Sequence, residues 1–226
     1  MVKKTIVIFG ASSEFAREFI KVCYKNNEHL VLISRNNINT NNGVHKQTLV
    51  KDYILDLEKI IENIKNLNNC YIVFFNGVIF ENRPITFPTP EEIKLTEYVN
   101  YFVPFTVTNE LNKSLDNVRK YIFISSIAAV TPRRKNYIYG QNKRKLEKEI
   151  KKLDLPSSLF IRFGKINTNM SKSHKNPPFV LNPDKAAEIL YSKLNSENIT
   201  YPNFGLFLIS LILKITPKKL IDLIGL

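Results

Sequence analysis

The chain of 226 residues contains no tryptophan and only two cysteines and seven glycines. Two cysteines are too few for a disulfide-based scaffold, and neither Cys23 nor Cys70 belongs to a spacing typical of a zinc site. We therefore predict reduced, buried cysteines and no metal centre. The chain also lacks a run of about 18 apolar residues, so no membrane-spanning helix is expected.

Acidic residues are also scarce: 20 Asp and Glu stand against 33 Lys and Arg, which gives a net charge of +13. Such a charge can favour binding to nucleic acids, to anionic membranes or to acidic cofactors. It can also simply keep the surface of the protein solvated. No zinc-finger spacing or aromatic-basic RNA signature is present, so no nucleic-acid partner is expected. The N-terminal MVKKTIVIFG predicts a strand rather than a secretory signal, because its apolar run is short. We expect a cytoplasmic protein.

Short apolar runs alternate with longer segments of helical periodicity, a pattern typical of an α/β fold with a parallel sheet. Strands are predicted over 5–9, 29–34, 45–50, 70–75, 121–126 and 158–163. Helices are predicted over 17–25, 55–67 and 91–115 (with a bend near Pro104), from Tyr139 through 152, and from 183 onward. The prediction is one Rossmann-like, doubly wound domain over 1–226, in which 171–226 forms a lid and a C-terminal extension.

The most informative stretch is 121–143, an apolar strand that ends in Ser125 and Ser126 and is followed by Tyr139 and Lys143. Positions i and i+4 share one helix face, so this Tyr and Lys can point into one cleft. A nearby ammonium favours the phenolate, which predicts a lowered pKa for Tyr139. A Tyr and a Lys four residues apart are common by chance, and the strand context is what favours a proton-transfer site.

The beginning of the chain supports this interpretation. Residues 5–9 form an apolar strand, the turn Gly10-Ala11-Ser12-Ser13-Glu14-Phe15-Ala16 follows, and a helix comes next. A strand, a small-residue turn and a helix form the first unit of a dinucleotide-binding fold, with the pyrophosphate at the helix N-terminus. Together these features resemble the short-chain dehydrogenase/reductase family over roughly 4–190. In the family turn T-G-x-x-x-G-x-G, Gly10 is kept, Glu14 replaces the second Gly and Ala16 the third.

The resemblance implies a set of cofactor contacts. They are Gly10, Ser12, Ser13, Glu14, Phe15, Arg35, Asp52, Asn76, Gly77, Tyr139, Lys143 and Thr168. The basic Arg35, just after the second strand, favours the 2′-phosphate of NADP(H), although NAD(H) stays open. Asp52 is implied for the adenine amino group and Thr168 for the nicotinamide or the pyrophosphate. The carboxylate of Glu14 would disfavour a pyrophosphate unless it points away.

The resemblance also implies a reaction, namely hydride transfer between a nicotinamide and a carbonyl or alcohol substrate. Tyr139 would exchange the proton, Ser126 would orient the oxygen, and Lys143 would bind the ribose. Asn100, in the segment YVNYF, would support the proton path. A ketoreductase or alcohol dehydrogenase follows from this assignment. Two alternatives stay open: a non-catalytic NADP-binding regulator, and a nucleotide-sugar epimerase or dehydratase, for which the short C-terminal region leaves little room.

The substrate and the assembly rest on thinner signals. The G-A-S-S-E turn resembles a subgroup that includes the ketoreductase of decaprenylphosphoryl-ribose epimerisation, which suggests a sugar or lipid-linked sugar of cell-envelope polysaccharide biosynthesis. Relatives in the family are often homo-dimers or homo-tetramers. The apolar segment 204–213, followed by Lys214, Lys218 and Lys219, is interpreted either as a core or oligomer element or as a peripheral membrane contact.

Overall fold

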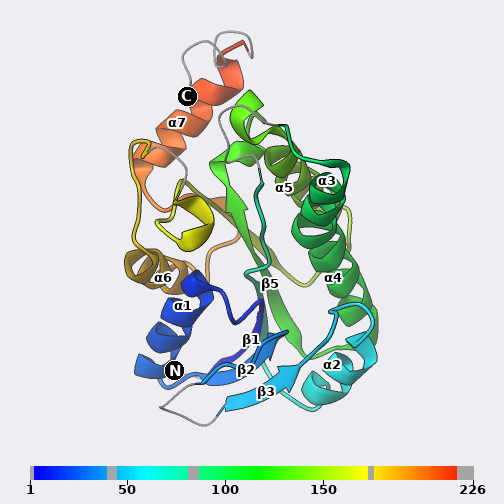
Figure 1. The fold of residues 1–226 in the computed structure, drawn as a ribbon. Coiled ribbons are helices and arrows are strands. Elements are labelled where there is room, and N and C mark those ends of the chain that lie inside the picture. The colour runs from blue at the N-terminus through cyan, green and yellow to red at the C-terminus, as the bar shows by residue number, and fades with distance from the viewer. Residues whose placement is uncertain (1–2, 40–44, 81–86, 173–175, 218–226) are drawn as a thin grey trace.

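A computed structural model describes residues 3–39, 45–80, 87–172 and 176–217 (Figure 1). Its centre is a parallel sheet with the strand order β3-β2-β1-β4-β5-β6-β7. The strands are β1 (Thr5–Phe9), β2 (His29–Ser34), β3 (His45–Leu49), β4 (Cys70–Phe74), β5 (Val118–Ser126), β6 (Ser158–Phe163) and β7 (Asn198–Thr200). The strand order reverses between β1 and β4, the place where such sheets bind ligands beyond their carboxyl ends.

The central strands are apolar on both faces because helices cover both faces. On one face lie α1 (Glu14–Lys25) and α6 (Pro183–Ser192), which pack on each other and share a core cluster with β1 and β6. The other face is covered by α2 (Leu57–Ile64), α4 (Val103–Ser114) and α5 (Tyr137–Ile150). Figure 1 shows the two helical layers on either side of the sheet. The predicted doubly wound α/β fold is confirmed.

The helix predicted over 91–115 consists of three parts. It begins as α3 (Pro90–Glu97), capped by Thr89, passes through a wider π-helical turn (Tyr98–Phe102) and continues as α4. Pro104 lies at the start of α4, directly after the wider turn, and its missing N–H removes one hydrogen bond to that preceding turn. The expected irregularity is therefore present, but it lies in the turn before the proline.

Two further details follow from the sequence. Both cysteines are buried and free, and burial raises the pKa of each thiol. The apolar segment at the end of the chain forms α7 (Phe204–Ile215). Within the described ranges, no helix is long and apolar enough to cross a bilayer.

Candidate active site

The proposed catalytic side chains lie where β5 ends and α5 begins. Ser126 is the last residue of β5 and caps the 3-10 turn Ile127–Ala129, because its Oγ accepts a hydrogen bond from the Ala128 amide at 3.2 Å. Tyr139 lies in the first turn of α5, and its phenol hydrogen-bonds to Ser126. The strand end and the helix start thus bring together two hydroxyls that are 13 residues apart in the chain.

The pKa of Tyr139 does not follow the expectation from sequence. Burial raises it to about 12, and the hydrogen bond with Ser126 opposes this only in part. The sequence argument, which predicted a pKa lowered by Lys143, is wrong in direction here because desolvation of the phenolate outweighs the other influences. At neutral pH the phenol holds its proton, which is the state a proton donor needs.

Lys143 lies one turn further along α5 and is also buried. Its Nζ donates hydrogen bonds to the carbonyls of Asn76, at 3.3 Å, and Ile124, at 3.1 Å, and lies 5.8 Å from the centroid of the Tyr139 ring. Burial lowers the pKa of Lys143 to about 8, while the charge of Glu147 acts in the opposite direction. The ammonium therefore links the carboxyl ends of β4 and β5.

A buried ion pair beneath Lys143 was missed by the sequence reasoning. Glu147, one turn beyond Lys143, pairs with Arg162 of β6 through two hydrogen bonds and accepts a third from Ser125 at 2.5 Å. Arg162 also donates to the Tyr201 hydroxyl at 2.9 Å. In the sequence, a Glu four residues after a Lys on a highly charged helix is expected to be solvent-exposed. Glu147 is buried instead, because α5 packs against β6 at this position.

Asn100 lies fully buried in the π-helical turn. Its amide nitrogen donates to the carbonyls of Val78 and Thr96, at 2.8 and 2.9 Å, and its Oδ1 accepts a bond of 3.4 Å from the Val78 amide. These bonds pin the chain after β4 beside Gly77. The side chain holds the loop that carries Asn76, to which Lys143 binds.

Gly140 is a further residue that the sequence reasoning missed. A Cβ at this position would lie 2.7 Å from the Ala128 carbonyl oxygen, closer than real contacts allow. Only glycine lets α5 approach the 3-10 turn after Ser126 so closely. In the sequence, the signal that could have identified Gly140 is its position directly after Tyr139. A glycine beside a candidate catalytic residue often marks a place where two backbone segments lie very close together.

The turn between β1 and α1 has a backbone geometry that fits the predicted pyrophosphate site. Gly10 has φ +72°, which favours glycine, and a Cβ there would meet the Asn76 nitrogen and the Phe75 carbonyl carbon at 3.1 Å. Ser13 caps α1 by accepting from the Ala16 amide at 3.2 Å, and Phe15 turns into the core. Ser12 is partly exposed at the same turn. The helix N-terminus can therefore hold an anion.

Glu14 points away from the turn and binds across to the segment after β6. Its carboxylate accepts hydrogen bonds from the backbone amide and the side-chain amide of Asn169. Thr168, the neighbouring residue, caps the 3-10 turn Asn169–Ser171 together with Ser171. The contact places Thr168 next to the N-terminus of α1 and gives the Glu14 carboxylate its hydrogen-bond partners on the segment after β6.

Arg35, Asp52 and Asn76 gather around the hydroxyl of Tyr53, another residue missed from sequence. Burial raises the pKa of Tyr53, while the Arg35 charge and hydrogen bonds with Asn76 and the Gly10 amide oppose the rise. Arg35 itself is exposed directly after β2. Asn76 Oδ1 is buried and has no hydrogen-bond partner among the described residues. An orphaned acceptor beside the Gly10 turn fits a ribose hydroxyl, so the residues present fit a dinucleotide.

The carboxylate of Asp52 accepts more hydrogen bonds within the protein than the sequence suggests. Its carboxylate accepts from the Tyr98 hydroxyl at 2.7 Å and from the amides of Ile54 and Leu55 at 2.8 and 3.2 Å. Burial of the carboxyl opposes ionisation, but these bonds and the Arg35 charge outweigh it and lower the pKa. Asp52 therefore links the turn before α2 to the π-helical turn.

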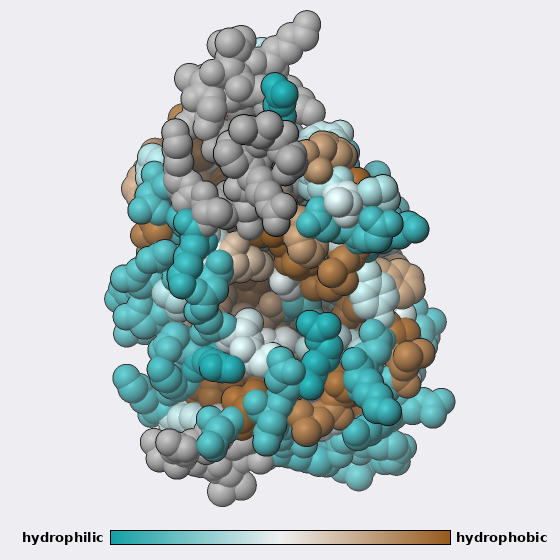
Figure 2. Space-filling model, in the orientation of Figure 1, coloured by the Kyte–Doolittle hydropathy of each residue, from teal (hydrophilic) through white to brown (hydrophobic). Residues whose placement is uncertain are grey.

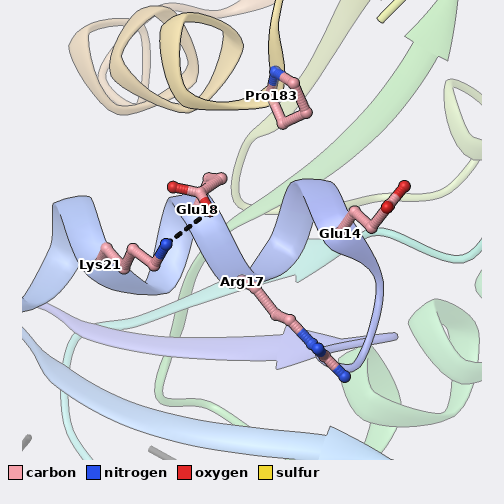
Figure 3. A pocket seen from close by; sticks show the side chains of 5 residues that line it. All are labelled: Glu14, Arg17, Glu18, Lys21 and Pro183. Atoms are coloured by element: carbon pink, nitrogen blue, oxygen red, sulfur yellow. Dashed lines mark hydrogen bonds and ion pairs between the residues drawn. The ribbon is translucent and has the colours of Figure 1, made fainter. Parts of the chain in front are cut away.

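The surface around these residues has two distinct hollows. Figure 2 shows hydrophobic side chains in a recess near the middle of the viewed face, between hydrophilic side chains. A separate depression of about 460 Å³ lies between α1 and the start of α6, lined by Glu14, Arg17, Glu18, Lys21 and Pro183. In Figure 3, Glu14 and Arg17 point apart there, and Lys21 pairs with Glu18. This charged depression holds none of Ser126, Tyr139 and Lys143.

Two further predictions concern the lid with the C-terminal extension, and the absence of a metal centre. Residues 173–175 of the expected lid and 218–226 of the extension, including Lys218 and Lys219, lie outside the described residues. Across the described ranges, no cluster of three or more His, Cys, Asp or Glu side chains is arranged to hold a metal ion.

Comparison with known proteins places the fold. No family model matches the chain, and no curated protein sequence matches it. A short-chain dehydrogenase from Burkholderia cenocepacia J2315, solved with NADP, superposes with a TM-score of 0.78 at 13% identity over 97% of this chain and 96% of that one. A short-chain dehydrogenase family protein from Francisella tularensis gives 0.74 at 14% identity, covering 92% and 100%. An alcohol dehydrogenase from Thermococcus sibiricus, complexed with 5-hydroxy-NADP, gives 0.71 at 14% identity over 88% and 95%. The chain has the fold of the short-chain dehydrogenases/reductases.

Proposed function

We propose that this protein is an NADP(H)-dependent oxidoreductase of the short-chain dehydrogenase/reductase family, acting between a carbonyl compound and its alcohol. The observation that carries the proposal is the convergence of Ser126, Tyr139 and Lys143 at the carboxyl ends of β4 and β5, beside the Gly10 turn. The similarity of the fold to NADP-bound dehydrogenases supports it.

The side chains divide the chemistry among them. The bound nicotinamide supplies or accepts the hydride. Tyr139, whose pKa lies near 12, holds the proton that the substrate oxygen receives during reduction, and takes it back during oxidation. Ser126 hydrogen-bonds the same phenol and would orient the substrate oxygen. Lys143, held by the Asn76 and Ile124 carbonyls, would bind the nicotinamide ribose through its ammonium.

The cofactor side of the site favours NADP(H). The exposed Arg35 stands directly after β2, next to Tyr53, and a guanidinium matches the geometry of a 2′-phosphate. The Gly10 turn and the N-terminus of α1 would hold the pyrophosphate, and Asn76 Oδ1 would accept from a ribose hydroxyl. Thr168, brought to α1 by its neighbour Asn169, would contact the nicotinamide end.

A sugar or lipid-linked sugar substrate, a cytoplasmic location and a homo-dimeric or homo-tetrameric assembly stay predictions. They rest on the turn sequence and on the family resemblance. A screen of carbonyl compounds that includes keto-sugars and prenyl-linked sugars tests the first, and sedimentation velocity tests the last.

The proposal is tested first by cofactor binding. Thermal unfolding is measured with NADPH, NADP, NADH and NAD in parallel, because a ligand at a hundred times its dissociation constant adds about 2.7 kcal/mol of apparent stability. We expect a shift with NADPH and NADP that Arg35→Gln reduces. Substrate-dependent NADPH oxidation then tests catalysis. Absence of a shift with all four nucleotides would contradict the proposed function, whereas a shift without turnover on any carbonyl would favour the regulatory alternative.

A further inference from the structure

Helix α7 carries a continuous hydrophobic stripe on its outer side. The exposed side chains are Phe204, Phe207, Leu208, Leu211, Ile212 and Ile215, with exposed fractions from 39% to 83%. Their spacing of three and four residues places all six on one face of the helix. We propose that this face, the α7 stripe, docks the protein on the surface of an anionic lipid bilayer.

The inner side of α7 is firmly part of the fold. Asn203 caps the helix by accepting from the Leu206 amide at 2.9 Å. Leu213 is buried against Ile127 and Val130, and its carbonyl accepts from the Thr131 hydroxyl at 2.9 Å. The orientation of the helix is thus set from within, and the apolar stripe faces outward as a consequence of that packing.

The charge around α7 matches an anionic surface. No Asp or Glu occurs between residues 117 and 146, between 155 and 183, or between 198 and 221. The first stretch contains residues 127–131, which pack on α7, and the third contains α7 itself. Arg134 and Lys214, which lie in these two stretches, are exposed. Each Lys or Arg near an anionic membrane adds to the attraction. The net charge of +13 acts in the same direction.

The dimensions also favour a lipid surface over a second copy of the chain. A helix of 12 residues is about 18 Å long, too short to cross a bilayer but suited to lie in its interface. Six side chains along one helix offer a few hundred Å² of apolar area, on the order of the largest patch of an ordinary monomer. A stable protein interface needs roughly 800 Å² from each partner.

The position of the stripe relates it to the catalytic residues. Ile127 and Val130, on which Leu213 packs, directly follow Ser126. Figure 1 shows α7 at the end of the molecule toward which β5 runs. Docking would therefore bring the carboxyl end of β5, with Ser126, toward the lipid surface, which favours amphiphilic carbonyl substrates held in that surface. This last step rests on the proposed function, whereas docking itself does not.

The test is co-sedimentation of the full chain with vesicles of phosphatidylglycerol and phosphatidylcholine in equal parts, and with phosphatidylcholine alone. We expect the protein to pellet with the anionic vesicles at least tenfold more than with the neutral ones. The double variant Leu211→Glu, Ile212→Glu is expected to stay in the supernatant. Leu55→Glu, which changes a leucine that is 86% exposed elsewhere on the molecule, is the matched control and is expected to pellet like the parent.

Three outcomes overturn the proposal, and the sedimentation with vesicles can give two of them: a parent protein that stays in the supernatant, or a loss of binding that Leu55→Glu shares. Sedimentation velocity of the same proteins tests whether a second copy of the chain, rather than a membrane, covers the α7 stripe. If the parent is an oligomer that the double variant dissociates, the stripe is an interface between copies and the lipid proposal is wrong. Thermal unfolding confirms that the variants fold, and NADPH binding reports the proposed enzyme function independently.

Discussion

The two ends of the proposed cofactor site are built in different ways. At the catalytic end, Ser126, Tyr139 and Lys143 converge, and Lys143 is backed by the buried Glu147. At the dinucleotide turn, the backbone of Gly10 keeps the expected conformation while Glu14 occupies a position that the related turn reserves for glycine. Proton transfer depends on particular side chains, whereas a pyrophosphate is held by backbone amides. The turn can therefore accept a new side chain that finds a partner elsewhere.

Asn169 is that partner. By accepting two hydrogen bonds from it, the Glu14 carboxylate is drawn over to the segment after β6. A residue that departs from a sequence motif therefore has to be judged by the contacts that its side chain makes in the folded protein. The first three predictions below probe the catalytic end, and the last probes the turn.

The largest effect is expected from Tyr139→Phe. Removing the proton donor should lower kcat for carbonyl reduction by about 10²- to 10⁴-fold and leave NADPH affinity and folding unchanged. The measurement is steady-state NADPH oxidation beside a binding titration. Tyr137→Phe, two residues earlier on the same helix, is the control and should keep its turnover. A Tyr139→Phe protein with full turnover would remove the basis for the catalytic assignment.

Gly140→Ala tests whether close packing builds the catalytic end. The new Cβ would lie 2.7 Å from the Ala128 oxygen and push α5 from the turn that follows Ser126. We expect a loss of about 1–3 kcal/mol in the free energy of unfolding, measured by urea denaturation. Gly77→Ala is the control for stability, since its Cβ meets nothing closer than 3.6 Å. Equal stability of the two variants would show that the approach of α5 can relax at no cost.

Glu147→Gln tests the electrostatic support of Lys143. Burial lowers the pKa of this lysine to about 8, and the Glu147 charge limits the fall. Without that charge the ammonium should lose its proton at a lower pH, so the alkaline loss of NADPH affinity should begin about one pH unit earlier. The measurement is the dissociation constant for NADPH as a function of pH.

The control for this change is Glu149→Gln, on the same helix, where the carboxylate pairs with Lys152 at the surface. Its pH profile should match that of the parent. Since Glu147 also pairs with the buried Arg162, a thermal melt must confirm that the variant folds. An unchanged pH profile in a folded Glu147→Gln protein would assign Glu147 to structure alone.

The smallest effect is expected at the turn, from Glu14→Gln. Removing a carboxylate near the pyrophosphate position relieves a repulsion of about 1 kcal/mol, which corresponds to roughly fivefold tighter NADPH binding. Calorimetric titration measures it, with Glu18→Gln, one turn along α1, as the control. If the variant instead binds NADPH more weakly, the contact between Glu14 and Asn169 organises the site. The turn would then depend on a particular side chain, as the catalytic end does.

Patterns local to the sequence were enough to predict β1 to β6, the helices between them and the spacing of Ser126, Tyr139 and Lys143, whereas β7 was not predicted. Apolar periodicity and the i, i+4 relation are local properties, and they survive folding because helices and strands have fixed repeats. For the same reason, the carboxyl end of β5 and the first turn of α5 could be expected to face each other. The Gly10 turn was predictable because only its local backbone conformation matters.

The surroundings of these residues, in contrast, depend on how distant segments pack against one another. The pair of Glu147 with Arg162, the fit of Gly140 against Ala128, and the bond of Glu14 to Asn169 join segments that are distant in the chain. The raised pKa of Tyr139 follows from burial, which no local pattern encodes. Likewise, an apolar segment near the end of the chain becomes an outward-facing stripe only once packing has chosen which side of α7 turns inward. Burial and long-range contact arise from the whole fold, and this is why sequence alone could name the reacting groups but not their environment.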